Sequence, residues 1–128
     1  MKAGSCLCGA VRFTVTAELK APDACHCRQC RKSSGHYFVS TDVPRAALQV
    51  GGSDHVTWYH SSDRVRRGFC ATCGSPLFFD PPARDWIGIA MGAFDGATGT
   101  KTELHVFVGE KGDYYAVADG LPQYDRLP

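Results

Sequence analysis

The chain has 128 residues, the length of one domain, and 44% of them are hydrophobic. Its 14 lysines and arginines nearly balance 13 aspartates and glutamates, which gives a formal net charge of +1. This balance argues against charge-driven disorder and against the strongly basic surface of a nucleic-acid-binding domain. The longest apolar stretch, residues 86–94, is too short to cross a bilayer, so no membrane partner is expected. We expect one domain over residues 1–128, with its core at about 3–124.

Strand signals dominate the chain. The first strand is predicted over residues 10–16, where Val11, Phe13 and Val15 alternate with polar residues. Aromatic and β-branched runs separated by turn residues predict further strands over 36–41, 55–59, 76–79, 86–91 and 103–108. Helix is expected only as one turn at 28–34, and residues 121–128 are expected to form a loosely held tail. The predicted fold class is mainly β with little helix.

Seven cysteines are the most unusual feature of the composition. They fall into three groups, at positions 6 and 8, at 25, 27 and 30, and at 70 and 73. An odd number cannot be fully paired within one chain, and no apolar leader precedes the first group. We therefore expect a reducing, cytoplasmic location, where clustered cysteines favour metal binding or catalysis over disulfides.

The spacing of the third group indicates zinc. Cys70 and Cys73 are two residues apart and are followed by Gly74, the pattern of a zinc knuckle. One knuckle supplies two ligands, whereas tetrahedral zinc needs four. Either the first group or members of the middle group could supply the other two.

Ligand counting favours two zinc ions per chain. If Cys6, Cys8, Cys70 and Cys73 hold one ion, four thiolates close a structural site. The other three cysteines, Cys25, Cys27 and Cys30, then hold a second ion with an open fourth position, as catalytic zinc is usually held. In the alternative, the knuckle shares its ion with two middle cysteines. Cys6, Cys8 and one middle thiol are then left to hold a second ion or to stay free. We prefer the first assignment because the middle group is compact enough to bind an ion alone.

Basic residues flank the cysteines of the middle group. Arg28, Arg31 and Lys32 are candidates to bind a substrate carboxylate. A second run, at positions 64, 66 and 67, precedes the knuckle and joins this cationic rim as a candidate. His26 stands between two predicted ligands and is a candidate catalytic residue, as a fourth ligand or proton shuttle, although its neighbours make simultaneous ligation awkward.

Three ordered motifs resemble the glutathione-dependent formaldehyde-activating enzyme family, which also includes centromere protein V. The matching segments are residues 4–11 (GSCLCGAV), 25–35 (CHCRQCRKSSG) and 67–78 (RGFCATCGSPLF), with weaker similarity at 105–108 and 119–124. The resemblance implies a zinc-binding β-tent fold with a structural zinc and a more labile second zinc. It implies the same division of the cysteines that ligand counting favours.

The family resemblance also implies a reaction, the joining of formaldehyde and glutathione to S-(hydroxymethyl)glutathione. We accordingly expect a zinc-dependent carbon–sulfur lyase whose partners are a small thiol such as glutathione and a small aldehyde. An open zinc site suits this chemistry, because it can deprotonate a thiol or polarise a carbonyl group.

Two other function classes compete with the lyase. One is a zinc-stabilised binding module that uses Trp58, Tyr59, Trp86 and residues 119–124 as a docking surface. The other is a thiol or metal sensor, in which the Cys25, Cys27 and Cys30 group loses its ion or is oxidised. A fourth protein ligand at the second ion would favour the binding module.

Overall fold

The computed structural model describes residues 1–128 and is built mainly of short strands. The strands and the α-helix are β1 (Lys2–Ser5), β2 (Arg12–Val15), β3 (Asp23–Cys25), α1 (Arg28–Ser34), β4 (Phe38–Pro44), β5 (Leu48–Gly51), β6 (Val56–His60), β7 (Arg66–Cys70), β8 (Pro76–Asp80), β9 (Trp86–Ala90) and β10 (Leu104–Val106). Single 3₁₀ turns are η1 (Arg45–Ala47), η2 (Ser53–His55), η3 (Met91–Ala93) and η4 (Val108–Glu110). None of these helices has the length and apolar character of a membrane span. The expected mainly β fold with little helix is confirmed.

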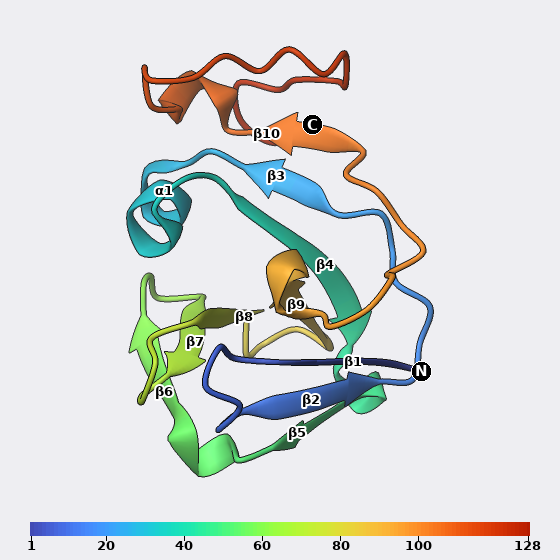
Figure 1. The fold of residues 1–128 in the computed structure, drawn as a ribbon. Helices are drawn as coiled ribbons and strands as arrows, with labels where there is room; N and C mark the ends of the chain where they lie inside the picture. The colour runs from blue at the N-terminus through green and yellow to red at the C-terminus, as the bar shows by residue number, and fades with distance from the viewer.

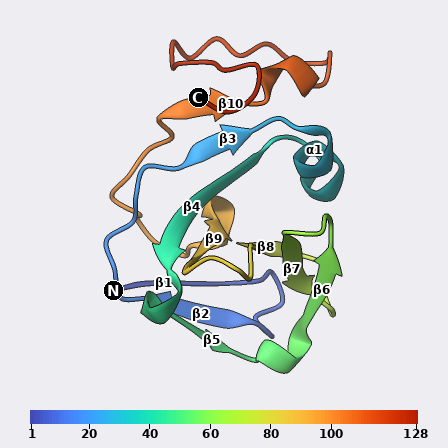
Figure 2. The same ribbon diagram turned by 180° about the vertical axis from the view of Figure 1, so that it is seen from behind.

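The strands form two sheets (Figure 1). The smaller sheet has the order β1-β2-β5 and is antiparallel. The larger has the order β10-β3-β4-β9-β8-β7-β6, in which only β10 and β3 run parallel. Seen from either side, the small sheet lies across β8 and β9, while β3, β10 and the C-terminal segment lie at the far end of the molecule (Figures 1 and 2).

The main hydrophobic core joins the two sheets. Phe13 and Val15 of β2 are buried and belong to the same apolar cluster as Leu77 and Phe78 of β8 and Ile89 of β9. The predicted alternation in β2 is therefore confirmed, because its intervening residues are more exposed. Two cysteines, at positions 6 and 70, are also part of this core, so the predicted metal ligands are anchored in it.

The helix α1 spans the predicted residues 28–34, and Cys27 is its N-cap. The Sγ of Cys27 accepts a hydrogen bond from the Cys30 N–H at 3.3 Å and so caps the helix N-terminus. At the other end, Gly35 has a φ of 87° and donates its N–H to the carbonyl of Arg31. A left-handed residue in this position favours glycine, which explains where the helix ends.

Each predicted strand region contains a strand, but several boundaries differ. The strand predicted from residue 10 starts at Arg12, because the Val11 carbonyl accepts the Cys6 N–H in a tight turn. The strand predicted over 36–41 runs from Phe38 to Pro44. Four short strands were not predicted, namely β1, β3, β5 and β7, which contain glycine or charged residues and lack a clear period.

The C-terminal residues are not a loose tail, and that expectation is wrong. The Tyr124 N–H donates to the His105 carbonyl, and the Tyr124 carbonyl accepts the Val108 N–H. The Phe107 N–H donates to the carbonyl of Arg126. An isolated parallel bridge also joins His105 to residue 123. These bonds hold the end of the chain against β10, because they satisfy backbone groups at the edge of the large sheet.

Candidate metal centres and the basic pocket

The first cysteine cluster comprises Cys6, Cys8, Cys70 and Cys73, whose Sγ atoms all lie within 4.8 Å of one another. The Sγ of Cys8 lies 3.6 Å from that of Cys6 and 3.8 Å from that of Cys70. Sulfur atoms bound tetrahedrally to zinc at about 2.3 Å are separated by about 3.8 Å. The donors and their spacing therefore fit zinc.

Each half of this cluster lies on a turn that ends in a glycine with positive φ. Gly9 has a φ of 80° and donates its N–H to the Cys6 carbonyl at 3.2 Å. Gly74 has a φ of 78° and donates to the Cys70 carbonyl at 2.8 Å. Such positive φ values favour glycine. The turns bring together two cysteine pairs that are more than 60 residues apart in the chain.

Hydrogen-bond donors also point at the sulfur atoms of the first cluster. The Val11 N–H lies 3.3 Å from the Cys6 Sγ, and the Cys73 N–H lies 3.5 Å from the Cys70 Sγ. A hydrogen bond from the Ser75 hydroxyl lowers the pKa of Cys73 to about 5. Such donors stabilise thiolates, which are the form that binds a metal.

The second cysteine cluster comprises Cys25, Cys27 and Cys30, whose Sγ atoms also lie within 4.8 Å of one another. Cys25 ends β3, Cys27 caps α1, and Cys30 lies buried in the first helical turn. The cluster offers three ligand atoms where the first offers four. Three thiolates fit a zinc ion that keeps one position open.

The three thiols of the second cluster are not equivalent. Hydrogen bonds from Cys25 and Cys30 lower the pKa of Cys27 far below its usual value. The contact with Cys27 raises the pKa of Cys25 in turn. Negative charge is therefore most stable on Cys27, at the N-terminus of α1, where the helix dipole also favours it.

Arg67 of β7 contacts this cluster from across the molecule. Its Nη1 and Nη2 atoms lie 3.7 Å and 3.6 Å from the Cys30 Sγ. Nη1 also contacts the Ser33 hydroxyl of α1, and Nε donates to the Ser61 hydroxyl. The guanidinium group is thus held beside a buried sulfur atom.

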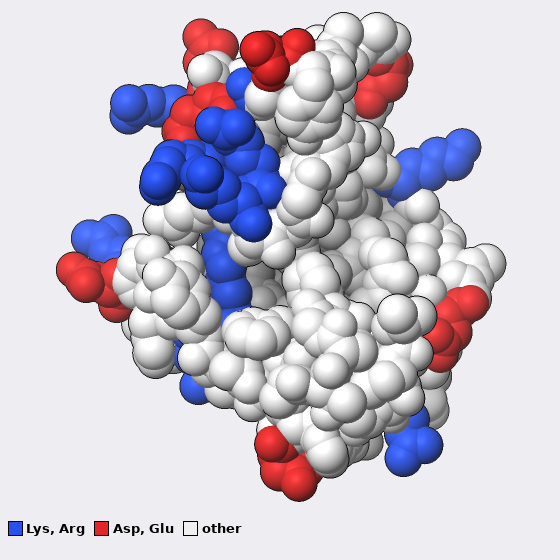
Figure 3. Space-filling view, turned by 60° about the vertical axis from the view of Figure 1, so that its left-hand side comes forward, with Lys and Arg blue, Asp and Glu red and all other residues white.

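A basic pocket of about 400 Å³ opens between α1 and the β6–β7 turn. Its lining residues are Arg28, Gln29, Lys32, Ser33, Tyr59, Ser61 and Arg67. Figure 3 shows basic side chains gathered on this side of the molecule, next to a hollow in the surface. Arginine and lysine groups arranged around a pocket can bind carboxylates.

A second, more apolar pocket of about 320 Å³ adjoins the basic pocket. Ser33, Tyr59 and Arg67 line both. The side chain of Phe38, which packs against Cys30, lines the apolar pocket together with Phe69, Gly74, Pro76 and Phe78. The two pockets therefore meet at these shared residues, and Arg67 and Phe38 are the lining residues that contact Cys30.

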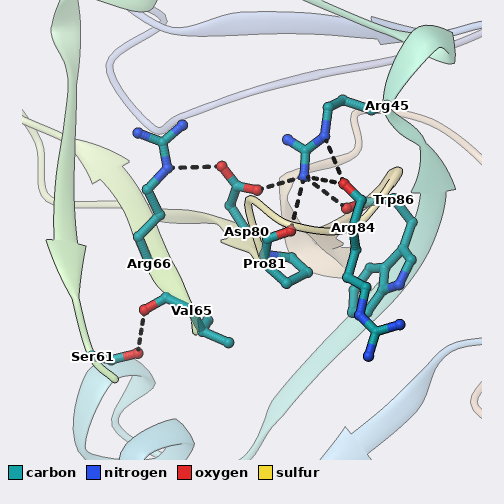
Figure 4. A network of polar contacts seen from close by, with 8 residues as sticks. All are labelled: Arg45, Ser61, Val65, Arg66, Asp80, Pro81, Arg84 and Trp86. Carbon is teal, nitrogen blue, oxygen red and sulfur yellow. Dashed lines mark hydrogen bonds and ion pairs between the residues drawn. The ribbon is translucent and has the colours of Figure 1, made fainter. Parts of the chain in front are cut away.

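Of the basic residues predicted to form the rim, Arg64, Arg66 and Arg31 do not line the basic pocket. Arg64 is exposed on the β6–β7 turn. Arg66 binds the buried carboxylate of Asp80, which also binds Arg45 (Figure 4). The guanidinium group of Arg66 also lies 3.9 Å from the Trp58 ring. These contacts give Arg66 a structural position away from the cluster.

Arg31 points elsewhere in the molecule. Its Nε atom is buried without a hydrogen-bond partner. Burial, reinforced by Tyr114 and Tyr37, raises the pKa of Tyr115, and the positive charge of Arg31 opposes that rise. Among the three basic residues predicted next to the cysteines, Arg28 and Lys32 therefore line the pocket and Arg31 does not.

His26 is fully buried, and both of its ring nitrogens have partners other than the cysteines. Nδ1 is hydrogen-bonded to the Tyr115 hydroxyl, and Nε2 lies 2.8 Å from Nδ1 of His105. Burial, with the nearby charge of His105, lowers the pKa of His26 to about 4. The ring is therefore neutral at pH 7.

Residues of the competing docking surface are spread over the large sheet. Tyr59 of β6 is exposed, but Trp58 packs on Phe78, and Trp86 of β9 stacks on Phe79. Residues 119–124 lie next to β10, at the opposite end of the sheet from β6. The structure does not bring these residues together into one surface.

Sequence reasoning missed several residues around the second cluster. It assigned no role to Tyr115, His105 or Asp119, although the similarity segments at 105–108 and 119–124 include two of them. It also did not single out Arg67 from its neighbours Arg64 and Arg66. The available signal was membership of the similarity segments, since Arg67 opens the segment 67–78 whereas Arg64 and Arg66 lie outside it.

Comparisons with known proteins agree with the geometry. The family model described as "Glutathione-dependent formaldehyde-activating enzyme" matches residues 1–110. A protein of Halomonas elongata named "Putative glutathione-dependent formaldehyde-activating enzyme" is 31% identical over 124 residues, covering 89% of this chain and 79% of that protein. An uncharacterized lyase of Schizosaccharomyces pombe is 27% identical over 117 residues, covering 91% of this chain and 85% of that protein.

A solved structure shares the fold. The crystal structure of a Rhodobacter sphaeroides protein superposes with a TM-score of 0.63 at 23% sequence identity. The match covers 74% of this chain and 89% of that one. At this level of identity the likeness supports the fold alone.

Proposed function

Because this chain belongs to the glutathione-dependent formaldehyde-activating enzyme family, we propose that it is a zinc-dependent carbon–sulfur lyase. Its substrate is the adduct of a small thiol, such as glutathione, with a small aldehyde. In the direction of synthesis, a carbon–sulfur bond forms between thiol and aldehyde, and the thiol proton ends on the former carbonyl oxygen.

The difference between the two cysteine clusters is the observation that carries this proposal. The first cluster has four ligand-type sulfurs and the second has three. In the proposal, Cys6, Cys8, Cys70 and Cys73 hold a structural zinc, and Cys25, Cys27 and Cys30 hold the zinc at which substrate is bound. Zinc bound by three protein ligands supplies a Lewis acid at an open position.

The residues around the second cluster have distinct proposed roles. Arg28, Lys32 and Arg67 bind the carboxylates of the thiol substrate, because they line one pocket and carry the matching charge. The apolar pocket beside Cys30 excludes water from the reacting atoms. Arg31 adds positive charge nearby without lining the pocket. The sequence alone had made Arg28, Arg31 and Lys32 equal candidates for binding the substrate carboxylate.

His26 takes no part as a zinc ligand in this proposal. Its ring nitrogens are already hydrogen-bonded to other side chains. The proposed location is the cytoplasm, since clusters of free thiols survive best in a reducing compartment.

Exchange NMR on a mixture of formaldehyde and glutathione tests the proposed reaction. The zinc-loaded protein is expected to increase the rate of exchange between free formaldehyde and S-(hydroxymethyl)glutathione in proportion to its concentration. Replacing the thiol by one without carboxylates is expected to raise KM, because the basic pocket then has no anion to bind. Exchange at the spontaneous rate, with both clusters loaded, would rule out this substrate pair.

A further inference from the structure

Two buried histidines next to the second cluster belong to one continuous chain of hydrogen bonds. His26 has no exposed surface, and His105 of β10 is 3% exposed. Nε2 of His26 lies 2.8 Å from Nδ1 of His105, and Nε2 of His105 lies 2.8 Å from a carboxylate oxygen of Asp119. At the other end, Nδ1 of His26 is bound to the Tyr115 hydroxyl.

The carboxylate of Asp119 fixes the direction of its own hydrogen bond in this chain, because an ionised carboxylate only accepts. A hydrogen bond from His105 holds the pKa of Asp119 below its usual value, so this carboxylate is ionised at neutral pH. Nε2–H of His105 therefore donates to Asp119. The other ring nitrogen of His105 is hydrogen-bonded to His26, whose second ring nitrogen is hydrogen-bonded to the Tyr115 hydroxyl.

This chain of hydrogen bonds fixes His26, the residue between Cys25 and Cys27. The backbone N–H of His26 donates to the Val106 carbonyl at 3.0 Å, so His26 is held by both its backbone and its ring. The partners are themselves fixed. Asp119 accepts the Leu121 N–H at 3.1 Å, and the Lys111 ammonium group donates to the Tyr115 carbonyl at 2.7 Å.

Two members of the chain come from the C-terminal segment. The family match ends at residue 110, whereas Tyr115 and Asp119 lie beyond it. The segment is also anchored to β10 by the backbone bonds of Tyr124. Residues outside the matched region therefore reach the turn that carries Cys25 and Cys27.

We propose that His105 and Asp119 are positioning residues of the second metal centre, which act through the ring of His26. By fixing that ring they hold Cys25 and Cys27 in the arrangement that brings their sulfurs together with that of Cys30. The role rests on the metal-binding part of the proposed function and does not require turnover. Loss of an outer-shell partner of a metal ligand typically lowers metal affinity by about 10- to 100-fold, and here the partner acts through the residue between two ligands.

Zinc affinity of the full-length D119A variant tests this role. Competition with a chromophoric chelator is expected to show zinc bound about 10- to 100-fold more weakly at the second centre, with the first centre unchanged. D119N keeps an acceptor for His105 and is expected to fall between D119A and wild type. The matched control is D113A, which removes an exposed carboxylate of the same segment that takes no part in the chain. Second-centre affinity within twofold of wild type in D119A would overturn the proposal.

Nitrogen-15 NMR of the histidine rings separates positioning from general loosening of the fold. In the wild type, Nε2 of His105 is expected to carry a proton that is hydrogen-bonded to Asp119. D119A is expected to shift the nitrogen resonances of both rings, while the control variant keeps those of the wild type. Unchanged ring resonances in D119A would contradict the chain as drawn. Weakened zinc binding without any lyase activity in the wild type would sink the proposed reaction and leave the positioning role standing.

Discussion

Arg67 and Cys70 lie three residues apart on β7 and face different cysteine clusters. Arg67 reaches the Cys30 Sγ at 3.6 Å, whereas the Cys70 Sγ belongs to the first cluster, 3.8 Å from that of Cys8. Residues an odd number of positions apart on a strand point to opposite faces of the sheet, which explains this change of side. One short strand therefore contacts both the four-cysteine cluster in the core and the three-cysteine cluster beside α1.

Substitution of Arg67 tests the link between the basic pocket and the second cluster. R67Q removes the charge beside Cys30 and is expected to lower kcat/KM for glutathione adducts by roughly 10- to 100-fold, the equivalent of one charged hydrogen bond. R64Q is the matched control, because Arg64 is exposed and outside the pocket. Steady-state kinetics with both variants measure the difference, and equal kcat/KM values would exclude Arg67 from the substrate site.

Substitution of Cys70 tests the structural role of the first cluster. Cys70 is fully buried and belongs both to the core and to the cluster. C70S is expected to unfold the domain or lower its thermal midpoint strongly, because bound zinc contributes directly to the free energy of folding. Circular dichroism during heating measures this effect. A soluble variant with an unchanged midpoint would show that this cluster is dispensable for folding.

Substitution of Cys27 is expected to separate metal binding from folding. Serine is a good N-cap, so C27S keeps the start of α1 while removing one of three sulfur ligands. Metal analysis is expected to find one zinc per chain instead of two, with a thermal midpoint close to wild type. Two zinc ions retained in C27S would show that Cys27 is not a ligand.

The buried carboxylate of Asp80 stabilises the large sheet away from the site. It is 1% exposed and binds Arg45 at 2.7 Å and Arg66 at 2.8 Å. D80N leaves both guanidinium groups without a charged partner and is expected to lower the free energy of unfolding by about 2 kcal/mol. Urea denaturation measures the change, with D85N as an exposed control. Equal midpoints for D80N and wild type would contradict this role.

Asp42 is expected to make the fold less stable as pH rises, whereas a carboxylate in a salt bridge makes a fold more stable as pH rises. Burial, reinforced by Asp23 and opposed by Lys20, raises its pKa from 3.8 to about 6. The folded state therefore loses stability relative to the unfolded state as pH rises through this range. The thermal midpoint of D42N minus that of wild type is expected to increase as pH rises from 5 to 7.5. A difference that is constant with pH, measured by scanning calorimetry, would exclude this titration.

Much of the fold was predictable because its strands carry strong local patterns. Phe13 and Val15 alternate with polar residues, and α1 is bounded by Cys27 and Gly35. The strands that were missed depend on tertiary pairing. β3 has only three residues and is held between β4 and β10. The C-terminal segment was also misjudged, because its order comes from bonds to β10 that no local pattern encodes.

The candidate site was predictable where spacing carries the chemistry. The spacing of the cysteines gave three groups, and the combination of the first and third groups that ligand counting favoured is the one found in the structure. The contact of Arg67 with Cys30 required the assembled fold, because the two residues are 37 positions apart in the chain. The contacts of His26 with residues 79 and 89 positions away likewise required the assembled fold.

Reversible removal of zinc from the second centre alone is the most direct test of the proposed activity. Zinc held by three thiolates is expected to pass to a mild chelator before zinc held by four. Formaldehyde–glutathione exchange should then fall to the spontaneous rate while the near-ultraviolet circular dichroism stays unchanged, and one equivalent of zinc should restore it. Full activity in protein that retains only the zinc of the first cluster would contradict the account.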